Sequence, residues 1–197
     1  NVSLKVYDNL NSIATTWVII TVINLEPQVD FAVTPVSANT TVTFNFADNS
    51  SDPDGSIVEW TWDFGDGNSS SEQNPQHRYL LPGNYSVTLT VQDNLEAQNS
   101  TTQLLAVANA LPLLELKIPQ GVRDSAYWIV PAELEIGLDG SGSSDPEGLP
   151  LEFAWEVDGE TYSTPDIAVI LGTGSHAVSL TITDTHGATV NGNWTLM

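Results

Sequence analysis

The chain contains the same sequence motif three times, and a repeated motif restricts the fold to a unit that can be formed more than once. Residues 1–24 align without gaps with residues 86–109, and residues 178–184 carry the motif again. A second motif matches in the same way, at 51–62 and at 144–155. The alignments predict two full repeats, which run over 25–109 and 110–197.

Residues 1–24 correspond only to the last two strands of a repeat, so they are expected to form a terminal β-hairpin of an incomplete preceding repeat. A hairpin alone does not bury its apolar face. This segment is therefore expected to need strands from elsewhere. Two arrangements are open: the chain is a portion of a longer array, or it begins with strands that are donated to another subunit.

Within each repeat the apolar residues alternate with polar ones, as in Tyr85, Val87, Leu89 and Val91. A period of two is typical of half-buried β-strands. Turn sequences such as Asp-Pro-Asp-Gly at 52–55 separate the strands, and no window of helical length has an apolar stripe. The pattern predicts an all-β fold of antiparallel sandwiches joined in tandem.

Composition argues against several classes of function. The chain has 4 Lys plus Arg against 25 Asp plus Glu, which gives a net charge of −21. A surface of this sign repels phosphate, so no nucleic acid and no anionic membrane is expected as a partner. Cysteine is absent, which excludes disulfides and thiolate sites. The longest apolar stretch, 17–23, is far shorter than the roughly 20 residues that cross a bilayer, so no membrane insertion is expected.

The middle repeat carries an ordered series of short motifs. They are SDPDG at 51–55, WTWDFGDG at 60–67, HRY at 77–79, PGNYSVTL at 82–89 and VQD at 91–93. This series resembles the PKD (polycystic kidney disease) domain, an immunoglobulin-like sandwich of extracellular proteins, over the whole of 25–109. The third repeat has WEVDG at 155–159 instead, and is similar to a diverged PKD-like or cadherin-like unit. The resemblance implies tandem immunoglobulin-like (PKD-type) antiparallel β-sandwiches.

The WDFGDG string has two interpretations. The first is a strand that runs into a tight Asp-Gly turn, with Val58, Trp60 and Trp62 on its core face. The second is a catalytic pair, Asp63 and Asp66, but no base or nucleophile accompanies it. The three histidines lack metal-binding spacing, and no phosphate-binding glycine loop is present. Because the acidic residues recur from repeat to repeat, whereas catalytic groups occur once, no enzymatic activity is expected.

Acidic residues stand at corresponding places in both full repeats. In PKD-like and cadherin-like sandwiches, as the resemblance implies, these places meet beside the incoming linker. Oxygen ligands with little positive charge nearby favour Ca²⁺, and the four cationic residues Lys5, Arg78, Lys117 and Arg123 are expected elsewhere. We expect one Ca²⁺ at Asp52, Asp54, Asp93 and Asn24, and a second at Asp145, Glu147, Asp184 and Asn109. The alternative is a solvated turn whose Asp residues bond their own backbone.

Seven asparagines stand in Asn-x-Ser/Thr sequences, which accept N-linked glycans. They are Asn1, Asn39, Asn49, Asn68, Asn84, Asn99 and Asn193. Their number indicates a glycosylated chain that faces the outside of the cell, with Asn68, Asn84 and Asn99 expected to be the most accessible.

Two functions fit these patterns. The leading interpretation is a structural, glycosylated component of a cell surface, surface layer or extracellular filament, stiffened by calcium. It resembles archaeal surface proteins, and its partners would be copies of itself or neighbouring repeats, with surface carbohydrate as a further ligand. The alternative is an accessory carbohydrate- or protein-binding module of a secreted hydrolase or adhesin. An exposed aromatic platform would favour the alternative, and Trp17, Trp128 and Trp194 are the candidates.

Overall fold

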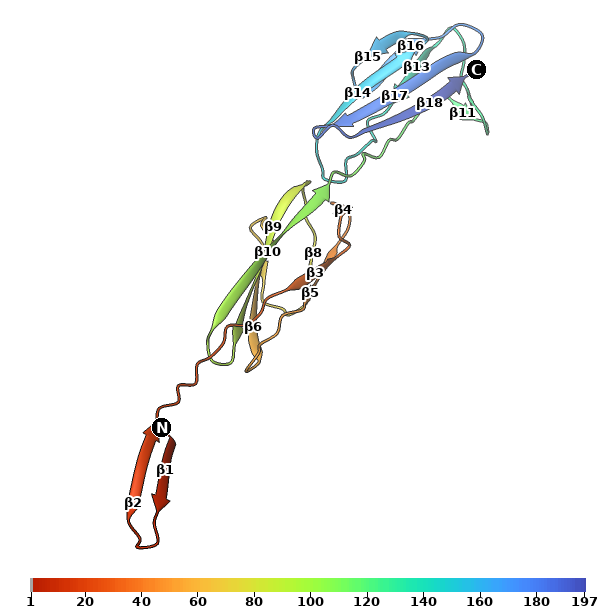
Figure 1. Ribbon diagram of the computed structural model, residues 1–197. Helices are drawn as coiled ribbons and strands as arrows, with labels where there is room; N and C mark the ends of the chain where they lie inside the picture. Colours follow the sequence, from red (N-terminus) through yellow and green to blue (C-terminus); the bar gives the residue numbers. More distant parts are fainter. Residues whose placement is uncertain (1) are drawn as a thin grey trace.

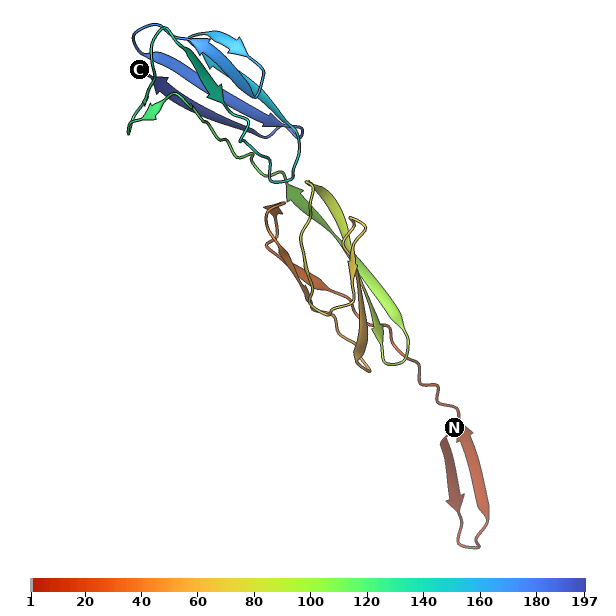
Figure 2. The same cartoon turned by 180° about the vertical axis from the view of Figure 1, so that it is seen from behind.

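A computed structural model describes residues 2–197. These residues form β-strands, turns and loops and contain no helix. Figures 1 and 2 show a hairpin, a middle unit and a third unit that follow one another along an extended chain. The expected all-β class is confirmed. In the part of the chain described here, there is no helix long and apolar enough to cross a membrane.

The hairpin consists of β1 (Val2–Tyr7) and β2 (Ile13–Val18), which pair with each other and with no other strand of the described chain. All residues of both strands are exposed to solvent. Its apolar side chains therefore lie uncovered, as in Trp17, which is 65% exposed.

The middle unit is a sandwich of two sheets. Its larger sheet has the order β4-β10-β9-β6-β7 and its smaller sheet the order β3-β5-β8. The strands are β3 (Phe31–Thr34), β4 (Ala38–Asn39), β5 (Phe44–Asp48), β6 (Ile57–Asp63), β7 (Ser69–Ser70), β8 (Gln76–His77), β9 (Gly83–Asp93) and β10 (Gln98–Ala108). The long antiparallel hairpin β9–β10 forms the centre of the larger sheet.

The third unit has the same two-layer plan. One sheet has the order β11-β12-β18-β17-β14-β15, and β13 pairs with β16 in the other. The strands are β11 (Val122–Arg123), β12 (Trp128–Ile129), β13 (Glu135–Asp139), β14 (Leu151–Val157), β15 (Glu160–Tyr162), β16 (Asp166–Ile170), β17 (His176–Asp184) and β18 (Thr189–Leu196). The hairpin β17–β18 takes the place that β9–β10 has in the middle unit.

Each unit has a separate hydrophobic core between its two sheets. Trp62 is fully buried in the middle unit, and Trp155 is nearly so in the third. Each indole N–H donates to a main-chain oxygen, at 2.9 Å to Glu72 and at 2.9 Å to Thr164 respectively. The two tryptophans thus occupy equivalent places, because alternation directs both toward the inner face of their strand.

The expectation that Val58 shares the core face with Trp60 and Trp62 is wrong. Trp62 is buried and Trp60 half-buried, but Val58 is 48% exposed. The pairing of β6 with β9 shifts register between Ile57 and Glu59, which is a β-bulge at Val58. A bulge inserts one extra residue into a strand and thereby reverses the direction of the side chains that precede it.

Replacement of Trp62 by Ala is expected to destabilise the middle unit by about 3–5 kcal/mol, because it leaves a large cavity in the core. The third unit has its own core, so its unfolding transition should not move. Differential scanning calorimetry of the variant and of the matching Trp155→Ala variant, which should show the reverse, checks this. Transitions that shift together in either variant would contradict the separation of the two cores.

Candidate cation sites at the unit junctions

Asp93 joins the last turn of the middle unit to the linker that enters it. This residue ends β9 and is 1% exposed. Its Oδ1 accepts the main-chain N–H groups of Leu95 at 2.8 Å and of Ala97 at 2.9 Å, and its Oδ2 accepts the side-chain amide of Asn24 at 2.7 Å. Burial raises the pKa of Asp93, but the hydrogen bonds from these three groups outweigh it and the pKa is lowered. Asp93 is therefore a carboxylate at neutral pH.

Asp52 and Asp54 lie at the same junction. The main-chain N–H of Leu25 donates to Asp54 Oδ2 at 3.2 Å, and that of Asp54 donates to Asp52 Oδ1 at 3.4 Å. Two oxygens there, Asp52 Oδ2 and Asn24 Oδ1, are buried without a hydrogen-bond partner. Burial raises the pKa of Asp52, and the charges of Asp54 and Asp93 raise it further. The junction thus crowds negative charge around oxygens that have no donor.

The second junction repeats the arrangement around Asp93. Asp184 ends β17 and is 4% exposed. Its Oδ1 accepts the main-chain N–H groups of His186 at 2.8 Å and of Ala188 at 3.0 Å, and its Oδ2 accepts the side-chain amide of Asn109 at 2.7 Å. Burial raises the pKa of Asp184 and these hydrogen bonds, first that of Asn109, lower it by more. Asp184 therefore holds the third unit to its linker as Asp93 holds the middle unit.

Glu147 connects the two full units directly. Its Oε1 accepts the main-chain N–H of Ala110 in the linker at 2.9 Å and the hydroxyl of Thr40 in the middle unit. Asp145 Oδ1 accepts the main-chain N–H of Glu147 at 3.0 Å. Three oxygens here have no hydrogen-bond partner although they are buried: Asn109 Oδ1, Asp145 Oδ2 and Glu147 Oε2.

One cation lies closer to this junction than the sequence indicated. Arg78 Nε donates to the carbonyl oxygen of Thr40 at 2.8 Å, and the Thr40 hydroxyl contacts Glu147. The expectation that all four cationic residues lie away from the acidic clusters is therefore wrong for Arg78. Parallel pairing of β4 with β10 places Thr40 at the end of the middle unit that faces the third. The hydrogen bond to Thr40 holds Arg78 at the same end.

The residues that the sequence assigned to two cation sites lie at the two junctions, where hydrogen bonds join them in pairs: Asn24 with Asp93, Asp54 with Asp52, Asn109 with Asp184 and Glu147 with Asp145. The ligand atoms that these residues could offer a metal are all oxygens, which Ca²⁺ prefers. No group of three or more His, Cys, Asp or Glu within residues 2–197 is spaced to hold a metal ion as it stands. Each predicted cation site also includes an Asn side-chain oxygen, of Asn24 or of Asn109, and a set limited to His, Cys, Asp and Glu does not count it. Five oxygens at the two junctions are buried without a hydrogen-bond partner, and a buried acceptor without a donor costs about 1–3 kcal/mol.

The WDFGDG string forms a structural turn. Asp63 Oδ1 accepts the main-chain N–H of Gly65 at 2.9 Å, and Gly65 has a φ of +78° that a side chain rarely adopts. Asp66 Oδ2 lies 2.7 Å from Nε2 of His77, whose ring stacks on Phe64 at 4.2 Å between centroids. Each carboxylate is thus engaged in the turn itself, which agrees with the first interpretation of the string.

The sequon asparagines differ in the freedom of their side chains. Asn49, Asn68, Asn84, Asn99 and Asn193 are exposed and Asn39 is half-buried, whereas Asn1 lies outside the described residues. The Asn99 amide donates to the carbonyl of Pro27 at 2.8 Å and the Asn68 amide to Asp66 Oδ2 at 3.0 Å. A glycan on Asn99 would therefore displace a contact that holds the incoming linker.

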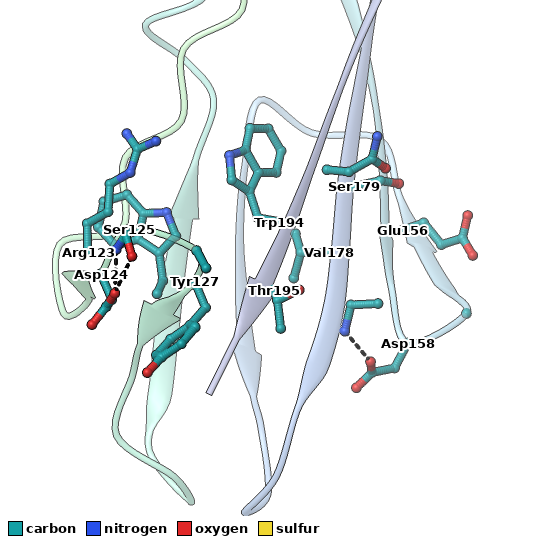
Figure 3. A pocket seen from close by; sticks show the side chains of 15 residues that line it. Arg123, Asp124, Ser125, Tyr127, Glu156, Asp158, Val178, Ser179, Trp194 and Thr195 are labelled. Atoms are coloured by element: carbon teal, nitrogen blue, oxygen red, sulfur yellow. Dashed lines mark hydrogen bonds between the residues drawn. The ribbon is translucent and has the colours of Figure 1, made fainter.

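The three tryptophans do not form one platform. Trp17 stands on the isolated hairpin, whereas Trp128 and Trp194 are half-buried and pack against the core of the third unit. Trp128 and Trp194 nevertheless both line a groove of about 720 Å³, which lies between the β11–β12 hairpin and strands β14, β17 and β18 (Figure 3). Tyr127 and Glu156 are among its lining residues, and sequence reasoning missed both.

A difference in length between the two repeats could have indicated this groove from the sequence. The bridge Gln28↔Ser51 encloses 22 residues in the middle unit, and the equivalent bridge Leu113↔Ser144 encloses 30 residues in the third. Strands β4 and β12 hold equivalent places, since each pairs in parallel with the last strand of its unit. The longer span accommodates β11, which has no counterpart in the middle unit and forms a wall of the groove.

Comparison with known proteins shows which families and proteins this chain is similar to. The family model described as PKD domain matches residues 24–108. Pre-pro-metalloprotease PrtV of Vibrio cholerae is 32% identical over 143 residues, which are 71% of this chain and 14% of that protein. A microbial collagenase of Vibrio alginolyticus is 44% identical over 70 residues, 36% of this chain and 8% of that protein. This chain therefore spans only a small part of these relatives.

Among solved structures, the PKD1 domain of Vibrio anguillarum Epp is 35% identical, with a TM-score of 0.40 over 43% of this chain and 96% of that chain. The PKD1 domain of the Vibrio cholerae metalloprotease gives 35% and 0.39 over 42% and 98%. The relatives that match by sequence are bacterial, so the expected archaeal origin is not supported. The motif series, the sandwich and the match over 24–108 together show that the middle unit of this chain belongs to the PKD domain family.

Proposed function

We propose that the chain is a non-catalytic accessory segment of a secreted bacterial hydrolase, in which tandem sandwiches separate and orient other domains. The observation that carries this proposal is the 32% identity to a metalloprotease over 143 residues, a span longer than either unit. Relatives named as collagenases point to the same class of protein. The comparisons give no support to a surface layer or filament, which was the leading expectation.

In this proposal the segment also contacts the polymeric substrate of the hydrolase, through the groove of the third unit. The groove volume of about 720 Å³ lies within the range of ligand sites. Tyr127 offers an aromatic face, and Glu156 and Ser179 offer hydrogen-bonding groups. The guanidinium of Arg123 lies 6.0 Å from the ring of Trp128, which braces the β11–β12 wall.

Replacement of Tyr127 by Ala in the natural protein is expected to weaken its binding to insoluble substrate about 5- to 30-fold, the usual effect of removing an aromatic anchor. Cleavage of a short soluble peptide should not change, because the groove lies outside any catalytic domain. Sedimentation binding to insoluble collagen, with cellulose as a second polymer, measures the first effect. Thr102→Ala, on the exposed face of the middle unit, is the matched control.

Two results would argue against this assignment. Unchanged binding of the Tyr127→Ala variant to both polymers would remove the groove as the contact surface. A parallel loss of short-peptide cleavage would contradict the accessory role, because it would connect the segment to the catalytic machinery.

We further propose that each junction holds a Ca²⁺ ion, by Asp52, Asp54, Asp93 and Asn24 at one and by Asp145, Glu147, Asp184 and Asn109 at the other. The buried unpartnered oxygens at both junctions support this assignment. A bound cation would offset the repulsion between the carboxylates. Asn24 and Asn109 already tie each linker to a domain end, so occupancy would restrict bending between units.

Extracellular calcium modules bind at about 10⁻⁴–10⁻³ M, and we expect that range here. Titration calorimetry of the 197-residue chain should show two sites, and Asp52→Ala and Asp145→Ala should each remove one. Asp63→Ala, which changes a turn outside both junctions, should leave both. An absence of calcium heat in the parent chain, or equal heats in all variants, would refute the calcium assignment.

Extracellular location and N-glycosylation belong to this proposal as well. Native material is expected to exceed the mass of the bare polypeptide in intact-mass spectrometry, because the exposed sequons, such as Asn49 and Asn84, would carry glycans. Asn99→Gln should not lower that mass, since its amide already holds Pro27. A native mass equal to that of the polypeptide would rule out glycosylation while leaving the accessory role intact.

A further inference from the structure

We propose that residues 2–24 close a further sandwich of the same class, and that the strands of a preceding unit in the same polypeptide cover their apolar face. This inference rests on the internal repeat and on the geometry of the hairpin, and does not depend on the proposed function.

The hairpin has the pairing register of the equivalent strands in the middle unit. Leu4 pairs with Thr16 in β1–β2, and their counterparts Leu89 and Thr101 pair in β9–β10. Counterparts in the two hairpins differ by a constant 85 positions, as the gapless alignment requires. Register determines which side chains share a face. Corresponding residues of the two hairpins therefore lie on corresponding faces.

The turn of the hairpin is also the turn of the full units. Asp8 Oδ1 accepts the main-chain N–H groups of Leu10 at 2.9 Å and of Ser12 at 2.9 Å, as Asp93 and Asp184 do for their own turns. The third residue after each Asp has a positive φ, of 61° at Asn11, 72° at Glu96 and 85° at Gly187. This agreement extends to backbone conformations that non-glycine residues rarely adopt.

One face of the hairpin is mostly apolar, with Val2, Leu4 and Val6 of β1 opposite Val18, Thr16 and Ala14 of β2, and apolar residues continue in the segment after β2. The apolar side chains that are at least 55% exposed include Val2, Leu4, Val6, Val18, Ile20 and Val22. In the middle unit the counterparts of Val2, Leu4, Val6, Ile20 and Val22 are almost completely buried, whereas Gln103, the counterpart of Val18, is exposed; the buried ones are Val87, Leu89, Val91, Leu105 and Val107. The opposite face is mixed, with Ser3, Lys5 and Tyr7 of β1 opposite Trp17, Thr15 and Ile13 of β2. A contiguous apolar face of this size on an otherwise strongly charged chain is a contact surface.

The equivalent units show what covers such a face. In the middle unit the cover is the β3-β5-β8 sheet, which contributes Phe31, Phe44 and Phe46 to the core. Within residues 25–197 each smaller sheet already contributes to the core of its own unit. The cover of the hairpin is therefore a further sheet of this kind, from residues outside 25–197.

Asp8 adds a specific feature to the inferred unit. In both full units the second oxygen of the equivalent Asp accepts an Asn side-chain amide from the incoming linker, at 2.7 Å in each case. Asp8 uses Oδ1 for the turn in the same manner. We infer that Asp8 Oδ2 accepts an Asn amide from a linker that enters the preceding unit.

Hydrogen exchange measured by mass spectrometry tests this inference, on the polypeptide as the organism makes it and on the 197-residue chain. The main-chain amides of β1 and β2 are expected to exchange at least 100-fold more slowly in the natural polypeptide. Leu4→Ser in that polypeptide should raise their exchange rate about 10-fold or more. Lys5→Ser, on the opposite face of the same strand, should leave it unchanged.

Two outcomes would overturn the inference. Equally fast exchange of the hairpin in both chains would show that no preceding unit covers it. Slow exchange in the 197-residue chain that increases with concentration, together with a dimeric mass in light scattering, would identify a second copy as the cover. Both readouts use unsubstituted chains, so they remain decisive if Leu4→Ser fails to fold.

Discussion

A buried carboxylate at the end of a long hairpin is the interaction on which this architecture depends. Asp93 and Asp184 each satisfy two main-chain donors of a turn with one oxygen and a linker amide with the other. A charged acceptor of three hydrogen bonds is stable when buried only if all of its donors are present. Formation of the turn and attachment of the linker are thus coupled, so each unit orients the chain that enters it.

The remaining oxygens at each junction follow from that arrangement. Because the amide nitrogens of Asn24 and Asn109 are directed at the carboxylates, their carbonyl oxygens are left buried without donors. Neighbouring carboxylates add to the same unsatisfied acceptor surface, and burial together with the nearby charges raises the pKa of Asp52. Such a surface suits a hard cation, whereas the Asn–Asp bond itself already sets the position of the linker.

The two full units share a two-sheet architecture but differ in the groove, which lies in the third unit. Their central tryptophans occupy equivalent places, and alternation in the sequence was enough to place them. The groove exists only in the third unit, because the extra span before Ser144 forms β11. A longer connection at the surface adds a wall without disturbing the core, since loops tolerate insertion better than packed strands do.

The sequence by itself determined the all-β class, because that depends on a period of two, and the correspondence between repeats predicted their limits and the two acidic sets. Tertiary structure decided what depends on packing between distant segments. The bulge at Val58 reversed a face that alternation had predicted. Thr40 contacts Glu147 through its hydroxyl and Arg78 through its carbonyl, which places Arg78 near the second junction. Tertiary structure also determined which oxygens lack a hydrogen-bond donor. Partners that are far apart in the chain meet only after both sheets have packed.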